Sequence, residues 1–418
     1  MKHEKSDESG LRRKLFRLFD KGKSIRHILK LIPRSRAWLY KWRARYQHHG
    51  ARAAPGAPTT PRHSPQAYPP AVIRLVLQVR QRLQRETVGL IGAKAIRREL
   101  QRRRLLRDLP SISTIHRILK RHGLVATAAR PKKESSYPAP QLSAERVFHA
   151  MDWMLRYLEG GEKVFIFHTI DLQTHELAQT LAHNKSVAAV RAHALQVWQA
   201  VGLPDFLQID NDAAFTGLGR KGRIFGQFVR LALYLGIELM FIPPSEPQRN
   251  HRVEGVNHLF SRSFWEKNHF ANFRAVERRR GKFLRWYQDY EPPALAGLSI
   301  KAARRKGKRR KLRASEVAAL PAALPLTTGR LHFIRQVSPR GEIEILKEKG
   351  KVSRWLAGRY VWAIVNTGPE RLQIYYRASP RHAVQLLQEY AYEVGEKVLP
   401  LQERYRRSKR VLPAENLF

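Results

Sequence analysis

Residues 1–50 place apolar side chains at helical spacing in three short stretches, LRRKLFRLFD, IRHILKLI and RAWLYKWRARY, separated by turn residues. Ser24 and Ser35 stand where the last two helices would have their N-caps. A short helix, a tight turn and a basic, aromatic helix are typical of a helix-turn-helix that binds DNA. A generic three-helix bundle with a basic, solvated face fits the same periodicity. In the helix-turn-helix interpretation, the DNA contacts come from Arg36, Lys41, Arg43 and Arg45.

The next segment has few large apolar residues, and its six prolines predict an extended linker over residues 51–70. Amphipathic stretches then return over residues 71–125, where Ser111 or Ser113 can cap the last helix and Gly123 can end it. We predict a second helix-turn-helix there, followed by a second linker over residues 126–145. Its expected phosphate contacts are Arg117, Lys120 and Arg121.

From residue 146 the pattern changes to apolar, β-branched and aromatic runs with turn breaks. RVFHAMDWML, KVFIFHTIDLQT and ELAQTLAHN predict an antiparallel meander. Helical and strand-like runs then alternate, with Ser186 as a helix N-cap. The order βββ-α-β-α-β-α predicts a mixed α/β layer over residues 146–275.

The C-terminal third is more basic. We predict a basic helical or linker region over residues 276–325, because residues 301–313 hold nine basic residues and no acid. Strand-like runs alternate with turn signals over residues 326–380, which predicts a small all-β barrel. Residues 381–418 read as a basic, mostly helical tail.

The charge balance indicates the class of partner. The chain has 79 Lys and Arg against 34 Asp and Glu, a formal net charge of +45, so a polyanion such as nucleic acid is expected. A ribosomal or histone-like protein fits the charge less well, because such chains lack long apolar β segments. The absence of cysteine excludes disulfides, zinc fingers and thiol nucleophiles. No signal peptide or membrane-spanning run is evident, so we expect a cytoplasmic, nucleoid-associated protein.

Three acids stand out within the predicted α/β layer. Asp152 lies in the first strand, Asp210 follows the fourth strand, and Glu254 lies on the helix after the fifth. If the first and fourth strands are neighbours, the three carboxylates converge. Unpaired carboxylates at short range repel one another, and Mg²⁺ relieves this because it prefers oxygen ligands. Two such ions can promote phosphoryl transfer.

These segments resemble the retroviral-integrase superfamily, with its RNase H-like DDE core. They are more closely similar to bacterial insertion-sequence transposases of the IS481 and IS3 type. The likeness rests on FHAMDW, FHTIDLQTHELA, LQIDNDAAF and PPSEPQRNHRVEGVNHLF, and on the flanking helix-turn-helix units and C-terminal barrel. It implies a multidomain chain: all-α helix-turn-helix units, an α/β RNase H-like catalytic core over 146–275, and an SH3-like barrel.

The resemblance also implies an activity. A DNA transposase binds the terminal inverted repeats of its element, cleaves the 3′ ends and joins them to target DNA, as a homo-oligomer on double-stranded DNA. Asp152 and Asp210 would share one Mg²⁺ and Asp152 and Glu254 the other, with Mn²⁺ able to substitute. The sequence leaves open whether the reaction needs a partner ATPase. The alternatives are a catalytically silent DNA-binding regulator and an RNase H-like nuclease.

The sequence departs from the family pattern at three places. Asp212 and His251 stand where glycine is common, and we favour a turn role for Asp212 over a role as an extra ligand. The interval from Asp210 to Glu254 is longer than usual, and we assign the extra length to the basic, glycine-rich segment 216–226, which fits either a DNA-contacting insertion or a surface loop. We expect Asp171 to cap a hairpin, and His168 and His183 to be packed strand residues. The remaining candidate DNA contacts are Lys221, Arg223, Gln248, Arg249, Arg252, Arg304, Arg305, Arg309 and Arg310.

Overall fold

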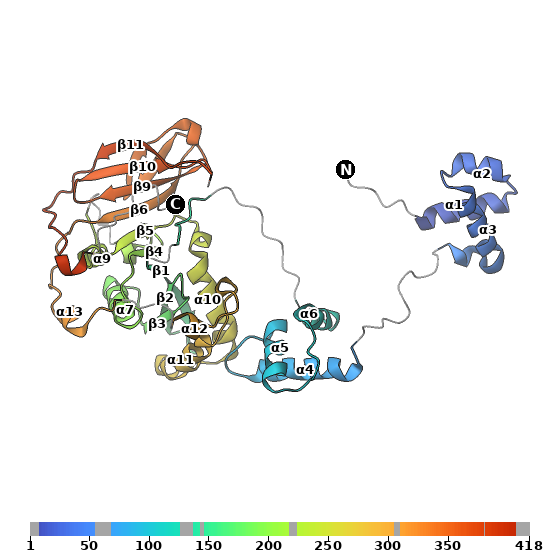
Figure 1. Ribbon diagram of the computed structural model, residues 1–418, viewed down its shortest axis with the longest axis horizontal. Helices are drawn as coiled ribbons and strands as arrows, with labels where there is room; N and C mark the ends of the chain where they lie inside the picture. The colour runs from blue at the N-terminus through green and yellow to red at the C-terminus, as the bar shows by residue number, and fades with distance from the viewer. Residues whose placement is uncertain are drawn as a thin grey trace. The chain divides into compact units, whose positions relative to one another are not determined.

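The computed structural model describes residues 8–54, 68–125, 137–142, 146–216, 224–304, 310–379 and 381–406. The chain divides into two compact units, Met1–Arg74 and Leu75–Phe418 (Figure 1). No helix in the described segments is long and apolar enough to cross a membrane. Most of both predicted linkers, part of the 216–226 segment, part of the basic run at 301–313 and the end of the tail lie outside these segments.

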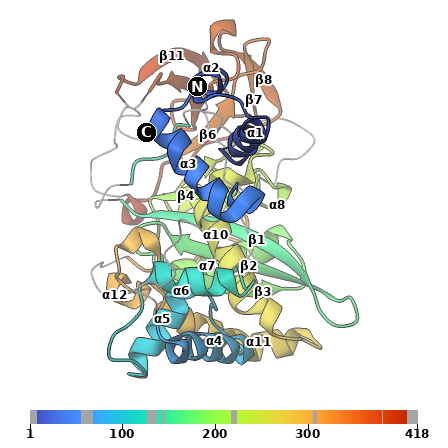
Figure 2. The ribbon, with the colours of Figure 1, turned by 90° about the vertical axis from the view of Figure 1, so that its right-hand side faces the viewer.

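The first unit is a small helical body with its own core. It contains α1 (Glu8–Asp20), α2 (Ile25–Leu31), α3 (Arg36–His49) and the 3₁₀ turn η1 (Gly50–Ala53) (Figure 2). The predicted caps are confirmed: the hydroxyls of Ser24 and Ser35 accept hydrogen bonds from the backbone N–H groups of His27 and Trp38. The core of this unit is formed by Leu15, Phe16, Ile28, Ile32, Leu39 and Trp42. Whether this unit reads DNA stays a prediction.

The second helical segment comprises α4 (Pro70–Arg85), α5 (Ala93–Arg102) and α6 (Ile112–Arg121). Ser111 caps α6, as predicted, by accepting from the N–H of Thr114. The ammonium of Lys267 donates to the carbonyls of Leu83 and Glu86. This segment is therefore tied to the region that follows α10.

A nine-stranded mixed sheet forms the centre of the second unit, in the order β11-β10-β9-β6-β5-β4-β1-β2-β3. Its core half agrees with the predicted element order. Strands β4 and β5 are short and almost fully buried, which is typical of parallel strands covered on both faces. The bounds are β1 (Phe148–Tyr157), β2 (Lys163–Asp171), β3 (Leu177–Ala182), α7 (Val187–Ala200), β4 (Phe206–Ile209), α8 (Ala213–Thr216), α9 (Gln227–Tyr234) and β5 (Glu238–Phe241).

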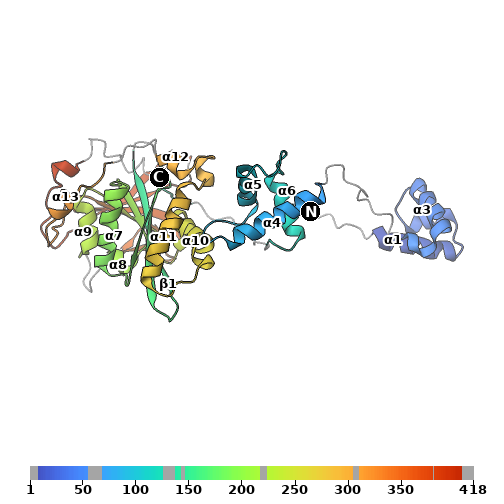
Figure 3. The same cartoon turned by 90° about the horizontal axis from the view of Figure 1, so that it is seen from below.

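Helices cover both faces of this sheet. Helices α7 and α9 pack on one face, and α10 and α11 pack on the other (Figure 3). Ser186 caps α7, as predicted, through the N–H of Ala189. The elements that follow β5 are η2 (Pro247–Asn250), α10 (His251–Ser263), η3 (Trp265–Lys267), α11 (Phe273–Gln288), η4 (Pro293–Leu295), α12 (Ile300–Arg304) and α13 (Ala314–Ala318).

The prediction of a separate barrel over residues 326–380 is wrong. Strand β6 (Arg330–Gln336) pairs in parallel with β5, and the rings of Phe241 and Phe333 stack at 4.9 Å between centroids. The physical reason is that β5 has an apolar edge whose backbone groups need a partner, and β6 supplies it. The sheet then continues antiparallel through β9 (Tyr360–Asn366), β10 (Arg371–Tyr376) and β11 (Gln385–Ala391).

Two further corrections concern the same region. Strand β11 lies in the tail that was expected to be mostly helical, and the only helical element described there is the 3₁₀ turn η6 (Glu403–Tyr405). A separate two-stranded hairpin, β7 (Glu342–Ile345) with β8 (Glu348–Lys351), precedes the 3₁₀ turn η5 (Arg354–Leu356). The core runs through the whole sheet: Leu331 and Val361 share one apolar cluster with Leu207 and Leu239.

This continuity predicts the effect of truncation. A chain that ends at residue 325 loses β6 and β9–β11, which bares the edge of β5 and the apolar residues packed on it. We expect insoluble protein or loss of the cooperative thermal transition, measured by circular dichroism and calorimetry. A chain that begins at residue 68 is the control, because the first unit has its own core, and it should keep the main transition. A soluble, cooperatively folding 1–325 fragment would show that the C-terminal strands are separable.

Candidate active site

The pairing of β1 with β4 brings two of the predicted acids together. These strands run parallel, with Phe148 opposite Phe206 and Ala150 opposite Gln208. The paired residues end there, because Ile209 is the last residue of β4 and Asp210 follows it directly. Since side chains two residues apart share a face of a strand, Asp152 lies on the face of the sheet that carries Ala150 and Gln208, and Asp210 begins the loop after β4.

Helix α10 covers that face, and it carries the third acid. The amide of Gln208 donates to Oδ1 of Asn250 at 3.0 Å, just before the helix begins. Two turns further, Nδ2 of Asn257 donates to Oδ2 of Asp152 at 2.7 Å. Glu254 lies between these contacts in the first turn of α10, on the same stripe of the helix. The helix therefore brings Glu254 close enough for its charge to raise the pKa of Asp152.

Asp152 is the acid whose pKa responds to the other two. Burial is the main reason that the pKa of Asp152 is raised to about 7. The N–H of Trp153 and the amide of Asn257 oppose this shift in pKa, while the charges of Asp210 and Glu254 add to it. Burial also raises the pKa of Asp210 and the pKa of Glu254. Burial is thus the largest cause of the raised pKa of each of the three acids.

The loop after β4 is fixed by hydrogen bonds. The N–H of Asp212 donates to Oδ1 of Asp210 at 3.0 Å, and Oδ1 of Asp212 accepts from the N–H of Ala214 at the start of α8. Oδ2 of Asp212 accepts from the ammonium of Lys185 at 2.7 Å. Asp212 thus makes the contacts of a turn residue. Lys185, which the sequence analysis missed, also lies 4.3 Å from the centre of the Trp153 ring, and its charge lowers the pKa of Asp210.

The donor set has the chemistry that a hard divalent cation requires, namely carboxylate oxygens that affect one another's protonation. Within the described ranges, no group of three or more His, Asp or Glu side chains is close enough to form a complete metal site. The carboxylates are therefore near enough to interact electrostatically but are not drawn together around one point.

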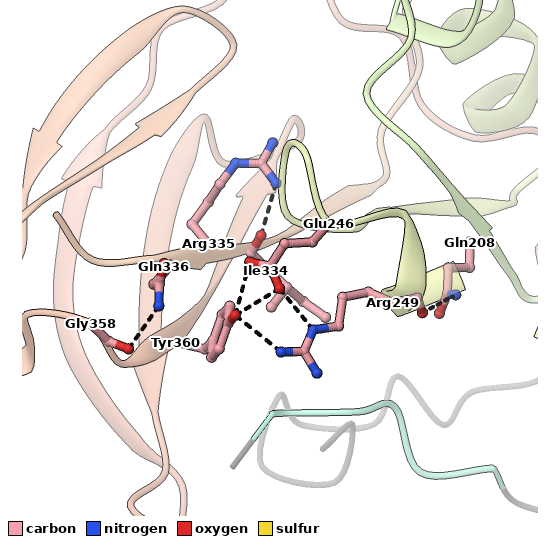
Figure 4. Close-up of polar contacts among 8 residues, drawn as sticks. All are labelled: Gln208, Glu246, Arg249, Ile334, Arg335, Gln336, Gly358 and Tyr360. Carbon is pink, nitrogen blue, oxygen red and sulfur yellow. Dashed lines mark hydrogen bonds and ion pairs between the residues drawn. The ribbon is translucent and has the colours of Figure 1, made fainter. Parts of the chain in front are cut away.

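The C-terminal strands brace the segments that carry these acids. Arg335 of β6 donates to Oδ1 of Asn211 at 2.8 Å and to the carbonyl of Ile242. Tyr360 of β9 donates to Glu246, and Glu246 also accepts from Arg249, in the segment that leads into α10 (Figure 4). The loop after Asp210 and the approach to Glu254 are thus both held by residues that lie far away in the sequence.

The predicted DNA contacts fall into three groups. In the first group, Gln248 and most of the predicted contact residues on α3 and α6 are exposed to solvent. The exception is Arg45, whose guanidinium lies over the Trp42 ring. Four others are engaged within the protein. Lys221, Arg223, Arg305 and Arg309 lie outside the described residues. The engaged four are Arg249 with Glu246, Arg252 with the carbonyl of Leu172, Arg304 with Glu176, and Arg310 with Glu316.

Arg249 was predicted to contact DNA at the surface, but its side chain is mostly buried inside the protein. Its side chain is only 9% exposed, and it lies 4.3 Å from the centre of the Tyr137 ring. The acid three residues earlier, Glu246, was a sequence signal for this pairing. The hairpin role of Asp171 is confirmed, since its Oδ1 accepts from the N–H groups of Gln173 and Thr174.

Comparisons with known proteins give weak likenesses. No family model matches this chain. The catalytic core domain of HTLV-2 integrase in complex with magnesium is 12% identical in its dimeric and trimeric forms, each with a TM-score of 0.27; the matches cover 40% of this chain and 99% and 97% of the integrase chains. The simian T-cell lymphotropic virus intasome in complex with PP2A regulatory subunit B56 gamma is 12% identical over 72% of this chain and 93% of that chain, with a TM-score of 0.33. At these values the likenesses assign neither a family nor an activity.

The raised pKa of Asp152 predicts a pH-dependent stability. A folded-state pKa above the unfolded value means that the folded protein binds more protons between about pH 4 and about pH 7, so stability falls as pH rises through this window. Asp152→Asn removes the penalty for the buried charge. With EDTA present, the difference in Tm between this variant and the wild type should increase in favour of the variant as the pH is raised from 5 to 8.

The matched control is Asp171→Asn, because Asp171 lies in the adjacent strand and accepts two backbone N–H groups. It should lower the Tm over the whole range. A difference in Tm between Asp152→Asn and the wild type that is constant with pH would contradict the electrostatic description of the site.

Proposed function

We propose that this protein is a DNA transposase that cleaves the 3′ ends of its element and joins them to target DNA by phosphoryl transfer. The observations that support the proposal are the parallel pairing of β1 with β4, the hydrogen bond from Asn257 of α10 to Asp152, and the charges of Asp210 and Glu254, which raise the pKa of Asp152. The order and directions of the core strands agree with the RNase H-like core that the sequence resemblance implies.

The proposal assigns the three acids as ligands of two divalent ions, Mg²⁺ or its substitute Mn²⁺. Asp152 and Asp210 would hold one ion, and Asp152 and Glu254 the other, as in the family that the sequence resembles. Bound ions of this kind activate the attacking oxygen and stabilise the leaving oxygen of an in-line displacement. The DDE ligand set fits this role because all three groups are hard oxygen donors.

The rest of the chain has supporting roles in this proposal. Asn257 orients the carboxylate of Asp152, and Lys185 offsets negative charge beside Asp210. The formal charge of +45 favours a long DNA footprint, with the helix-turn-helix units on the terminal inverted repeats. Bringing two element ends together requires a homo-oligomer on double-stranded DNA. A nucleoid-associated, cytoplasmic location follows from that substrate.

A strand-transfer assay tests the proposal against its rivals. The full chain is incubated with a labelled fragment of the element end, a supercoiled target and Mg²⁺ or Mn²⁺. Joined product supports the transposase. Cleavage without joining indicates an RNase H-like nuclease, and specific binding without either reaction indicates a DNA-binding regulator.

The neighbouring acids Asp210 and Asp212 allow a sharper test. Asp210→Asn should reduce cleavage and joining to background while end binding, measured by fluorescence anisotropy, stays near the wild-type value. Asp212→Asn is the control, because asparagine caps a helix as well as aspartate does and leaves the turn intact. It should keep most of the activity. Equal loss of activity in both variants would show that Asp212, and not only Asp210, belongs to the reactive group.

The exposed basic residues of α3 predict how the protein binds the element ends. Replacing Arg36, Lys41 and Arg43 together with alanine should weaken binding to the element ends. A plot of the log of the binding constant against log salt should become less steep by up to about 3, one for each lost phosphate contact. The paired substitution Arg36→Lys and Arg43→Lys keeps the charges and should keep the slope. An unchanged slope in the alanine variant would mean that α3 does not contact DNA.

A further inference from the structure

A continuous chain of hydrogen-bonded polar groups, two of them buried and two half-buried, leads to Asp152 from β3 at the edge of the core sheet. Asn257 connects Asp152 to His168: its Nδ2 is 2.7 Å from Oδ2 of Asp152, and its Oδ1 is 2.5 Å from Nδ1 of His168. On the other side of the imidazole, Nε2 of His168 is 2.7 Å from Nε2 of Gln179. His168 is completely buried, and Gln179 is 6% exposed.

The sheet fixes three of these residues in one row. Asp152 on β1 is the cross-strand partner of His168 on β2, and His168 is in turn the partner of Gln179 on β3. Partners in adjacent strands point to the same face, so the three side chains lie side by side. Asn257 reaches this row from α10, which covers the face. The backbone ladder therefore holds the row in place.

The direction of every hydrogen bond follows from the carboxylate. A carboxylate oxygen can only accept, so Asn257 must turn its amide nitrogen toward Asp152 and its carbonyl oxygen toward His168. His168 must then carry its proton on Nδ1. Its bare Nε2 accepts from the amide nitrogen of Gln179. Burial, the largest cause, lowers the pKa of His168 to about 4, which agrees with a neutral ring that holds one proton.

Burying such a row of polar side chains costs folding free energy. The Phe260 ring lies 5.2 Å from the imidazole ring, the charge of Arg156 also lowers the pKa of His168, and Oε1 of Gln179 is buried with no hydrogen-bond partner in the described part of the chain. An apolar packing of similar volume would avoid the cost of burying polar groups.

We propose that His168 is a positioning residue that fixes the Asp152 carboxylate for metal binding, acting through Asn257, and that Gln179 sets the tautomer of His168. This inference rests on the proposed function, because it assumes that Asp152 is a ligand of a divalent ion. Groups that orient a metal ligand in this way change metal affinity when they are removed.

The test measures Mn²⁺ binding to the full chain by electron paramagnetic resonance of the free ion. His168→Leu removes both ring nitrogens and should weaken Mn²⁺ binding by about 10–100-fold. His168→Asn places an amide nitrogen near the position of Nδ1, and it should restore most of the affinity. This rescue separates positioning from simple packing, since both variants lose the imidazole ring.

His193 provides the matched control. It is equally buried, but its Nε2 and Nδ1 are bonded to the hydroxyls of Thr169 and Thr180, on the other face of the sheet. His193→Leu should lower the Tm and leave Mn²⁺ affinity unchanged. Wild-type affinity in His168→Leu, or failure of His168→Asn to restore it, would overturn the inference while leaving the proposed function intact. A wild-type protein that binds no Mn²⁺ would overturn the proposed function and this inference with it.

A second measurement does not depend on the leucine variant. Nitrogen-15 spectra of histidine-labelled wild-type protein distinguish a proton on Nδ1 from one on Nε2, and the resonance of His168 is assigned by its absence in His168→Asn. We expect the Nδ1–H form. The Nε2–H form would reverse the chain of donors and overturn the inference even if His168→Leu fails to fold.

Discussion

The parallel register between β1 and β4 is the constraint on which the rest of the site depends. The two strands are separated by a hairpin, a third strand and α7, yet their pairing decides which side chains meet at the strand ends. A shift of one residue in this register would turn Asp210 to the opposite face, away from Asp152 and α10. The register is secured by apolar contacts on both faces, including the stacked rings of Phe148 and Phe206. The chemistry of the site is therefore a consequence of core packing.

The electrostatic design follows from that geometry. The chain has a large excess of basic residues, but a carboxylate beside another carboxylate in a half-buried site is unfavourable by itself. The protein offsets part of this cost locally, with the N–H of Trp153 and the amide of Asn257 on Asp152 and with Lys185 near Asp210. The remaining cost appears as the raised pKa of Asp152. A divalent cation is the partner that would remove it.

Local signals in the sequence were sufficient for the helix caps and for the order of the core elements, but not for long-range pairing. Serine caps mark helix starts because their hydroxyls satisfy nearby backbone N–H groups, so Ser35 and Ser186 could be assigned from the sequence alone. The choice of β6 as the partner of β5 could not, because strand runs of alternating polarity fit a barrel or a sheet edge equally well. His168 could have been placed opposite Asp152 only if the hairpin register had been known.

The same argument explains why the C-terminal strands matter for the site. An enzyme core that ended at α10 would leave the loop after Asp210 and the approach to Glu254 supported only by their own short-range contacts. Here Arg335 binds the loop through Asn211, and Tyr360 binds the approach through Glu246. Both braces come from strands that belong to the central sheet, so the sheet extension is part of the scaffold of the candidate site.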